Sequence, residues 1–452
     1  MLHAGSNRLI SALLHSSLPL AGPGDLEPLM RAVKDARYVL LGEASHGTHE
    51  FYTWRTEITK RLVLEQQCSF IAVEGDWPDC YRLNRYIKGL PGSGDSAEQV
   101  LHAFDRWPTW MWANREIVSL AEWLRRHNDT LPQEQKVGFY GLDVYSLWDS
   151  MDAVVEYLEK VDPLLAQDAR KAYRCFEPYA EDPQAYAKAT VIVPTSCEEE
   201  AVRVLRALRA KAPEYLEDGI DSYYNAEQNA LVAQGAERYY RAMVRGGPAS
   251  WNIRDRHMAE TLERLMHFHG KRAKTVVWEH NTHVGDARFT DMAAHGMVNL
   301  GQLVREAHDK SRDVVLVGFG TYSGTVLAAR HWGAPMERMP VPNARSDSLE
   351  DLLHRTATSG GRSSLPNASR DLLLIFDGSG NGGIAGLDDP VQHRAIGVVY
   401  NPEAERRGNY VPTVLPRRYD AFLFIDHTRA VDALHMAVQR DPDVPETFPS
   451  GM

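Results

Sequence analysis

Cysteine is scarce in this sequence, and positive charge is in deficit. The 452 residues include 4 cysteines, and no two of them form a CxxC pair, which argues against a disulfide scaffold, a zinc ribbon or a thioredoxin-type motif. A reduced, cytoplasmic setting fits this composition best. The 61 Asp and Glu residues outnumber the 50 Lys and Arg residues, for a net charge of −11. Because such a surface repels phosphate groups, we expect neither a nucleic acid nor a membrane surface as a partner.

Long apolar runs are also missing. Nowhere do about 18 uncharged apolar residues follow one another, so the sequence predicts no membrane-spanning helix. Near the N-terminus, polar residues interrupt Leu9, Ile10, Leu13 and Leu14, a spacing that predicts an amphipathic helix rather than a signal peptide. The GxSxG elbow, the GxxxxGK[ST] phosphate loop and the HExxH zinc motif are all absent. A serine nucleophile of the α/β-hydrolase type is therefore disfavoured.

Short apolar runs bounded by glycine or an acid recur along the chain. Four to five β-branched or apolar residues between turn signals are typical of buried strands. Helical patterns lie between most of these runs, which predicts an α/β fold with a mostly parallel central sheet flanked by helices. The predicted strands are residues 38–42, 69–73, 137–141, 275–278, 314–318, 372–376 and 396–400.

The stretch from residue 147 to residue 269 differs from the rest. It is rich in Ala, Leu, Glu and Arg, and residues 201–208 and 226–244 carry helical spacing. We interpret it as a large helical insertion between the third and fourth predicted strands. The expected organisation is a first part of the α/β core over 1–146, the insertion over 147–269 and a second part of the core over 270–452, forming one composite catalytic unit.

Polar side chains follow four of the predicted strands. Glu43 and His46 come after the first strand, Glu74 after the second, Asp143 after the third, and the segment 279–283 after the fourth. In open α/β sheets, ligands bind beyond the carboxyl ends of the strands. A single Glu at such a position is more often a neighbour of a helix cap, but four polar ends together predict a shared cleft.

His46 is the candidate general base of this cleft. It follows Glu43 across a glycine-bounded turn, so a carboxylate can fix the tautomer of the imidazole and raise its basicity. A histidine that only satisfies the turn is the alternative. Arg55 lies on the helix predicted after this turn and can pair with Glu43 or Glu74, unless it is simply exposed. Two glutamates in one partly dry cleft require a nearby cation or the protonation of one of them.

His280 and His283 are three residues apart and would face the same side of a helical turn. Two roles compete for this pair. The histidines could be acid–base partners of His46, or they could ligate a transition metal together with Glu43 or Glu74. The spacing alone leaves both open.

Several segments in the same order resemble the erythromycin esterase family, from about residue 35 to 430. The resemblance implies a hydrolase that opens a macrolide lactone or a related ester without a serine nucleophile, a metal or another cofactor. It implies that His46 deprotonates water and that Glu43 orients His46. Arg55 and Glu74 would shape the cleft, and His280 and His283 would position water or stabilise the oxyanion. The segments are residues 42–47 with Glu50 and Arg55, 72–76, 252–255, 277–288, 318–325 and 394–400.

Bulky apolar substrates need aromatic walls. Trp77, Trp107, Trp110 and Trp112 follow the second strand and could supply them, with Asp143 as a polar neighbour, although tryptophans in these positions could equally be core. Two other functions stay open at this point. The same His/Glu cluster could serve a metal-dependent hydrolase, or the protein could be a non-macrolide esterase or an accessory protein of biosynthesis without turnover.

Overall fold

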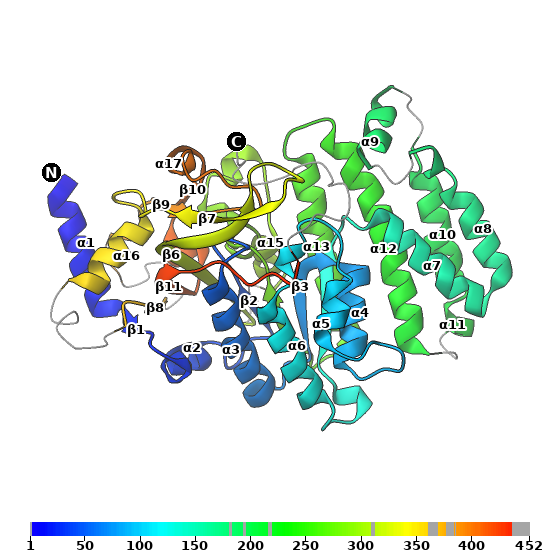
Figure 1. The fold of residues 1–452 in the computed structure, drawn as a ribbon, viewed down its shortest axis with the longest axis horizontal. Coiled ribbons are helices and arrows are strands. Elements are labelled where there is room, and N and C mark those ends of the chain that lie inside the picture. Colours follow the sequence, from blue (N-terminus) through cyan, green and yellow to red (C-terminus); the bar gives the residue numbers. More distant parts are fainter. Residues whose placement is uncertain are drawn as a thin grey trace.

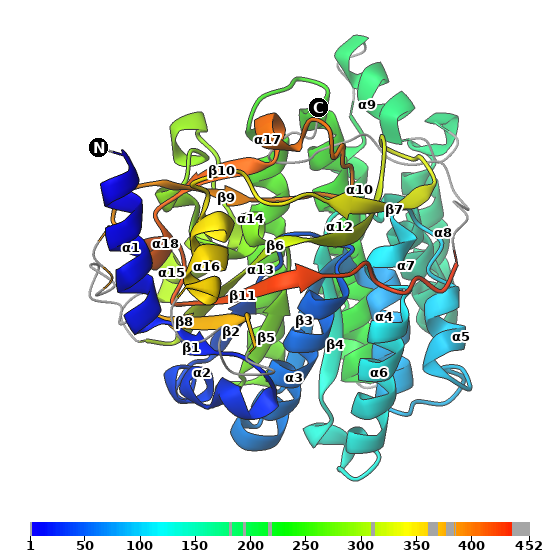
Figure 2. The ribbon, with the colours of Figure 1, turned by 60° about the vertical axis from the view of Figure 1, so that its left-hand side comes forward.

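A mixed β-sheet runs through the centre of the molecule (Figures 1 and 2). The structure is a computed structural model that describes residues 2–179, 183–192, 196–215, 219–308, 312–359, 369–376, 384 and 386–435. Its main sheet has nine strands in the order β1-β8-β11-β6-β2-β5-β3-β4, and β7 pairs with β6. The predicted α/β class is confirmed.

The strands that position the site are parallel and adjacent. They are β2 (Tyr38–Leu41), β5 (Thr275–Trp278), β3 (Phe70–Asp76) and β4 (Gly138–Asp143), paired in that order. Their short apolar runs are buried on both faces, as helices above and below a parallel sheet require. The carboxyl ends of these strands therefore meet at one edge.

The other half of the sheet is mixed. β11 (Ala421–Thr428) and β6 (Val314–Ala329) continue the parallel arrangement beside β2. β8 (Leu372–Ile375) runs antiparallel to β11, and β1 (Leu18–Pro19) runs antiparallel to β8. β7 (Met336–Val341) runs antiparallel to β6 and forms a hairpin with its far end. Figures 1 and 2 show this hairpin projecting beyond the parallel strands.

The strand predicted over residues 396–400 is wrong. These residues contribute isolated bridges, from Ile396 to Ser45 and from Val399 to Ala329. The strand lies just before them, as β9 (Val391–Arg394), and it pairs with β10 (Tyr410–Thr413) in a separate two-stranded sheet. The apolar run is buried because it packs against the main sheet, so its composition resembles that of a strand although it has no continuous partner.

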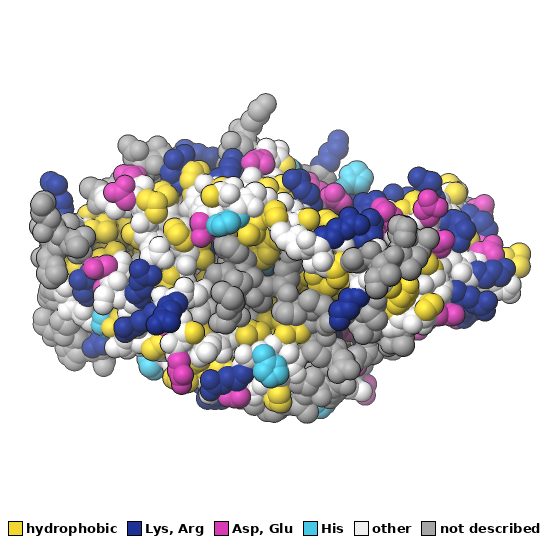
Figure 3. Space-filling model, turned by 90° about the horizontal axis from the view of Figure 1, so that it is seen from above, with side chains coloured by type: hydrophobic (Ala, Val, Ile, Leu, Met, Phe, Trp, Pro, Cys, Tyr) yellow, Lys and Arg dark blue, Asp and Glu magenta, His cyan; other side chains and the backbone are white. Residues whose placement is uncertain are grey.

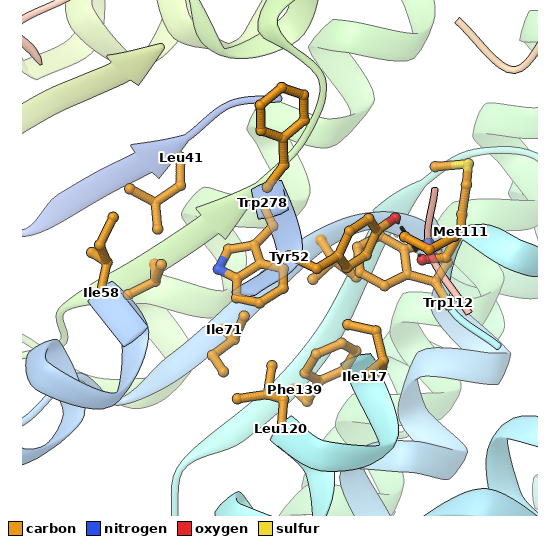
Figure 4. Close-up of a cluster of buried hydrophobic side chains, with 14 of the residues drawn as sticks. Leu41, Tyr52, Ile58, Ile71, Met111, Trp112, Ile117, Leu120, Phe139 and Trp278 are labelled. Atoms are coloured by element: carbon orange, nitrogen blue, oxygen red, sulfur yellow. Dashed lines mark hydrogen bonds between the residues drawn. The ribbon is translucent and has the colours of Figure 1, made fainter. Parts of the chain in front are cut away.

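Helices cover both faces of the main sheet. On one face, α2 (Glu27–Ala32), α3 (His49–Gln66) and α6 (Arg115–Asn128) share a core with the sheet, part of which Figure 4 shows around Tyr52 and Trp278. The other face is covered by α1 (Leu2–Ser16), α13 (Ala249–His269), α15 (Leu300–His308) and α16 (Leu349–Thr358). The predicted N-terminal helix is thus present as α1. Shorter helices complete the connections: α4 (Trp77–Ile87), α5 (Ala97–His102), α14 (Asn281–Val284), α17 (Glu405–Gly408) and α18 (Leu415–Arg418).

The chain between β4 and β5 forms a group of helices with a core of its own, at the right of Figure 1. The helices predicted over 201–208 and 226–244 are present as α10 (Glu198–Ala210) and α12 (Ile220–Met243). The others before α13 are α7 (Leu147–Val161), α8 (Pro163–Tyr173), α9 (Pro183–Ile192) and α11 (Ala212–Tyr215). The division into two core parts and an insertion stays a prediction.

Cys175 and Cys197 form a disulfide in this helical region, and their Cα atoms are 5.8 Å apart. This bond departs from the reduced state that the low cysteine number suggested. The two cysteines are 22 residues apart, and only the packing of the helices brings them together, so sequence spacing gave no signal for the bond. Cys68 and Cys80 are free and buried.

Charges of both signs are interspersed on the face of the molecule in Figure 3. Every helix in the described part of the chain is too short or too polar to cross a lipid bilayer.

Candidate active site

The polar side chains of the candidate site lie at the ends of the four adjacent parallel strands. Glu43 follows β2, Glu74 lies in β3, Asp143 ends β4, and His280 follows β5. The pairing of β3 with β4 shifts register between Val73 and Asp76. Such an irregularity bends a strand and changes the direction of its side chains, which here affects Glu74.

The turn that carries His46 is tightly packed. A Cβ atom at Gly47 would collide with the backbone of Leu327 in β6, so only glycine fits there. The Tyr52 hydroxyl lies 2.8 Å from the His46 carbonyl oxygen. The histidine is therefore held on a rigid support rather than on a free loop.

A strap of residues 429–434, which follows β11, ties this turn to the neighbouring loop. The Val431 amide donates to the Gly47 carbonyl, and the His49 amide donates to the Arg429 carbonyl. Further along the strap, Ala433 bridges to Asn114. The strap thus fixes the His46 turn relative to the tryptophan-rich loop before α6.

His46, Glu43 and Arg55 form a buried chain of contacts. His46 Nδ1 lies 2.9 Å from Glu43 Oε1, and a carboxylate can only accept, so Nδ1 carries the proton. Arg55 Nη2 donates to Glu43 Oε2 at 2.5 Å. The Arg55 guanidinium lies 4.6 Å from the ring centroids of both Tyr52 and Trp278, which hold it in place. In this tautomer of the neutral ring, Nε2 is the nitrogen that can act as a base.

His280 offers the complementary group. His280 Nδ1 lies 2.7 Å from the Thr282 hydroxyl and accepts from the Thr282 amide at 3.3 Å, which places the proton of the neutral ring on Nε2. Burial and the nearby His46 hold the pKa of His280 well below its usual range, so the ring stays neutral. His280 is 2% exposed, its Nε2 makes no hydrogen bond of ordinary geometry within the described residues, and the Ala44 backbone carbonyl partly opposes the lowering of its pKa. The ring centroids of His46 and His280 are 4.9 Å apart, which places a base and a donor side by side.

Arg254 supplies the cation that the crowded carboxylates require. It comes from α13 and donates to Glu74 Oε1 at 2.8 Å. It also makes two hydrogen bonds to Asp143, of 2.9 and 2.7 Å. The second Glu74 oxygen accepts from the His280 amide at 2.8 Å. Glu74 therefore joins α13 to the segment after β5.

His283 has contacts at both ring nitrogens. Nδ1 lies 3.0 Å from an Asp255 oxygen, and Nε2 lies 3.0 Å from Arg254 Nη1 and 3.4 Å from Glu74. Burial opposes the charged form, but the carboxylates of Asp255 and Glu74 outweigh it and raise the pKa of His283 to about 10. The ring also stacks on Trp251 at 4.6 Å. Of the two histidines, His280 is thus the one with a nitrogen left for a ligand.

Glu279 is a buried carboxyl group that takes no part in this network of contacts. It is 1% exposed, and neither of its oxygens has a hydrogen-bond partner among the described residues. Burial raises the pKa of Glu279 well above its usual range; His283 opposes the shift, and Glu74 and Asp255 add to it. Burial therefore favours the protonated form of this carboxyl group.

A cavity of about 110 Å³ opens at this edge of the sheet. His46, Glu74, His280, His283 and Asp143 line it, so the structure brings most of the expected polar residues together. Glu43 and Arg55 stand behind His46. The lining also includes Asp76, Asp79, Phe104, Arg106, Trp107, Met111, Trp112, Tyr145, Trp251, Arg254 and Trp332.

The tryptophans considered for the substrate wall divide into two groups. Trp107 and Trp112 line the cavity, and Trp112 donates to the Glu74 carbonyl at 2.9 Å. Trp77 and Trp110 are in the core instead, where Trp77 stacks on Tyr140. Sequence spacing could not separate the two groups because all of them follow the same strand.

Sequence reasoning assigned no role to Arg254, Asp255 or Trp332. Arg254 and Asp255 belong to one of the segments that carry the family resemblance, which was the available signal. Trp332 lies in the turn between β6 and β7, where nothing in the sequence indicated a site. Within the described ranges, no three His, Cys, Asp or Glu side chains are grouped so that they could hold a metal ion.

The chain is similar to known proteins along most of its length. A family model described as Erythromycin esterase matches residues 63–428. The Escherichia coli protein named erythromycin esterase type II is 23% identical over 373 residues, which cover 78% of this chain and 86% of that protein.

Solved structures share the fold. The crystal structure of a succinoglycan biosynthesis protein matches with a TM-score of 0.75 at 21% identity, covering 94% of this chain and 98% of that one. An erythromycin esterase mutant in its open conformation matches with a TM-score of 0.64 at 17% identity, covering 90% and 94%. At these identities, the structural matches concern the fold alone. Because the family model spans most of the sequence, we conclude that this protein belongs to the erythromycin esterase family of hydrolases.

Proposed function

We propose that the protein hydrolyses carboxylic esters or lactones by direct attack of water, with His46 as the general base. One observation carries this proposal. The Glu43 contact keeps the proton on His46 Nδ1, so that Nε2 is the basic nitrogen of a histidine that lines the cavity, and the His280 ring lies beside it with the two centroids 4.9 Å apart.

The reaction follows from these two histidines. His46 Nε2 takes a proton from water as the water oxygen attacks the ester carbonyl carbon. Glu43 stabilises the imidazolium that forms, and Arg55 holds Glu43 in place. His280 Nε2–H donates to the oxyanion. When the tetrahedral intermediate collapses, the bond to the alcohol oxygen breaks and His46 returns its proton to the leaving alcohol.

Glu74, Arg254 and His283 are assigned to positioning. Glu74 accepts from the His280 amide, and Arg254 and His283 contact Glu74 from the other side. The direction of the His280 ring is thereby coupled to α13. Asp143 balances Arg254 by accepting two of its hydrogen bonds.

Cavity size bears on the substrate. Pockets for drug-sized ligands have volumes of about 300–1,000 Å³. The cavity of about 110 Å³ is smaller, so a macrolide lactone, the substrate that the family name suggests, requires its walls to move apart. A small ester enters without that movement and is the first class to assay.

The His46→Ala variant tests the proposal. General-base catalysis contributes about 10²- to 10⁴-fold, so we expect kcat to fall by that factor while the circular dichroism spectrum is unchanged. The measurement is a hydrolysis screen of aryl esters, lactones and macrolides, read by mass spectrometry as the addition of one water. His295→Ala is the matched control, because His295 is exposed and lies outside the cavity. Equal turnover of His46→Ala and the wild type would refute His46 as the base.

Treatment with a chelator is a second arm of this test. We expect the activity to survive it, because the base is an imidazole. Loss of activity that a stoichiometric metal restores would contradict direct activation of water by His46. A protein that binds esters without turning over any of them would instead be an accessory protein.

A further inference from the structure

Asn281 links the two halves of the candidate active site. It directly follows His280 as the first residue of α14, and it is fully buried. Its backbone amide donates to the Glu43 carbonyl at 2.8 Å. The turn that carries the proposed base and the segment that carries the proposed oxyanion donor share this hydrogen bond, so the position of Asn281 affects the placement of both.

The side-chain amide of Asn281 has one orientation that satisfies its neighbours. Nδ2 donates to the Phe319 carbonyl at 2.7 Å, and Oδ1 accepts from the Phe319 amide at 3.2 Å. The remaining N–H of Nδ2 is available to His393 Nε2, which lies 3.1 Å away. Oδ1 also packs against Gly42, where a Cβ atom would collide with it. Reversing the amide would place donor against donor and acceptor against acceptor at Phe319, so these contacts fix the side chain.

His393 forms a second buried pair of a histidine with a glutamate. It lies in β9 and is fully buried, and its Nδ1 lies 2.6 Å from Oε1 of Glu350, a fully buried residue of α16. Burial opposes the ionised form of Glu350, but His393 and Arg394 outweigh it and lower the pKa of this carboxyl group. Burial also lowers the pKa of His393, which favours the neutral ring, although Glu350 opposes this shift. Nδ1 of the neutral ring therefore donates to the carboxylate, and Nε2 is the nitrogen that accepts from Asn281.

The chain just after His393 contacts the turn of the proposed base directly. The Ile396 amide donates to the Ala44 carbonyl at 2.8 Å, and Ile396 forms a bridge with Ser45. The turn is thus supported from the end of β9 in two ways. The backbone of Ile396 contacts the turn itself, and the side chain of His393 contacts Asn281.

We propose that His393 is a positioning residue of the hydrolytic site, because it holds Asn281, the residue that joins the turn of the base to His280. Glu350 supports this role by fixing the tautomer in which Nε2 is an acceptor. A buried pair of ionisable groups often adds less stability than apolar side chains of the same volume, so we expect its main effect on orientation. The effect on hydrolysis rests on the function proposed above, whereas the effect on the geometry of the turn that carries His46 does not.

Two substitutions of His393 separate orientation from packing. His393→Leu fills much of the space but offers no acceptor to Asn281, whereas His393→Gln offers an oxygen to Asn281 and an N–H to Glu350. We expect kcat of His393→Leu to fall by about 10- to 100-fold with KM within about twofold of the wild type, because the reacting groups are displaced, and His393→Gln to recover most of this loss. His354→Leu is the matched control and should leave kcat unchanged. His354 pairs with Asp426 from the same helix as Glu350, and it lies outside the cavity lining.

The hydrogen bond between His46 and Glu43 gives a readout that does not depend on turnover. A proton held between an imidazole nitrogen and a carboxylate resonates at low field in the proton NMR spectrum, and the signal that His46→Ala removes is that of His46 Nδ1–H. We expect the wild type, His393→Gln and His354→Leu to keep this signal, and His393→Leu to lose or broaden it. Glu350→Gln, which leaves the imidazole of His393 in place, should weaken the signal in the same direction and replaces His393→Leu if that variant does not fold.

The two readouts together decide the proposal. An unchanged signal and an unchanged kcat in folded His393→Leu would overturn it. In an active protein, a change in only one of the two readouts, or an equal fall of kcat in His393→Gln and His393→Leu, would assign His393 to stability alone and would overturn it as well. Loss of the signal in His393→Leu, in a protein that hydrolyses no ester, would support the positioning role and refute the proposed function.

Discussion

Glu279 lies at the end of β5 as a carboxyl group without a hydrogen-bond partner for either oxygen among the described residues. Its pKa is raised, mainly by burial, so the folded protein favours the protonated form, whereas the solvated side chain of the unfolded chain ionises at its ordinary pKa. The folded state therefore holds a proton that the unfolded state releases. Stability contributed by such a group is greatest below the unfolded pKa of about 4.3 and falls as the pH rises above it.

The Glu279→Gln variant should remove this dependence, because an amide has the shape of the protonated carboxyl and does not ionise. We expect the variant to be more stable than the wild type at pH 8 and close to it at pH 5. Urea denaturation at both pH values measures the difference. Glu43→Gln is the matched control, and it should destabilise the protein instead. The substitution breaks the buried ion pair with Arg55 and should lower the free energy of unfolding by about 3–5 kcal/mol. A wild-type advantage over Glu279→Gln that grows with pH would contradict the assignment.

For individual residues, contacts between positions close together in the sequence could be predicted, and contacts between distant positions could not. Glu43 and His46 are three residues apart in one turn, so their contact was predictable, and Arg55 was expected to pair with Glu43 or Glu74. The true partner of Glu74 is Arg254, which is 180 residues away along the chain. Only the packing of α13 against the strand ends brings that pair together.

At the scale of elements, the hairpin of β6 and β7 closes the cavity from one side. Trp332 lies in the turn of this hairpin and contacts Trp107 of the opposite loop, with ring centroids 4.4 Å apart. Trp107 also donates to the Ala334 carbonyl at 3.1 Å. Both tryptophans line the cavity, so this contact limits its size.

Trp332→Ala should widen the cavity. We expect kcat/KM for a bulky ester to rise at least about tenfold relative to that for a small acetate, because the apolar wall no longer excludes added methylene groups. Paired assays on esters of increasing chain length measure the change. Trp123→Ala is the control, since Trp123 stacks on His127 at a partly exposed position of α6. An unchanged preference for small esters would show that another part of the wall sets the limit.

The elements themselves were predictable to different degrees. β2 and β5 are continuous apolar runs buried on both faces and were recognised, whereas β11 was missed although it is a buried apolar run of the same kind. β7 was missed because it is half-exposed and contains Pro340, and residues 396–400 were mistaken for a strand because packing, not pairing, buries them. The composition of a segment indicates whether the segment is buried more directly than it indicates which strand, if any, pairs with it.

At the scale of the whole molecule, the helices between β4 and β5 bury a core separate from those of the sheet. The Cys175–Cys197 bond closes a loop within this part, with a sequence separation of 22 residues. A cross-link of that length stabilises a folded chain by about 2–4 kcal/mol. Its effect should be concentrated in the helices around it.

Replacing both Cys175 and Cys197 by Ser should therefore accelerate hydrogen exchange in α8 and α10 and leave kcat unchanged. Mass spectrometry of exchanged peptides locates the effect. Reduction of the wild type should reproduce it, and reduction of the double variant should add nothing. Faster exchange in the central strands, or a loss of turnover, would mean that the helical part and the sheet unfold as one unit.

The strap of residues 429–434 has a consequence for the order of synthesis. It supports the turn at Gly47 and His49, although more than 370 residues separate it from that turn. A ribosome makes the turn early and its support late, so a nascent chain lacks the finished His46 geometry until residue 434 has left the exit tunnel. The protein is therefore expected to become active only after the strap has been synthesised. A truncated product that ends before the strap is expected to be inert.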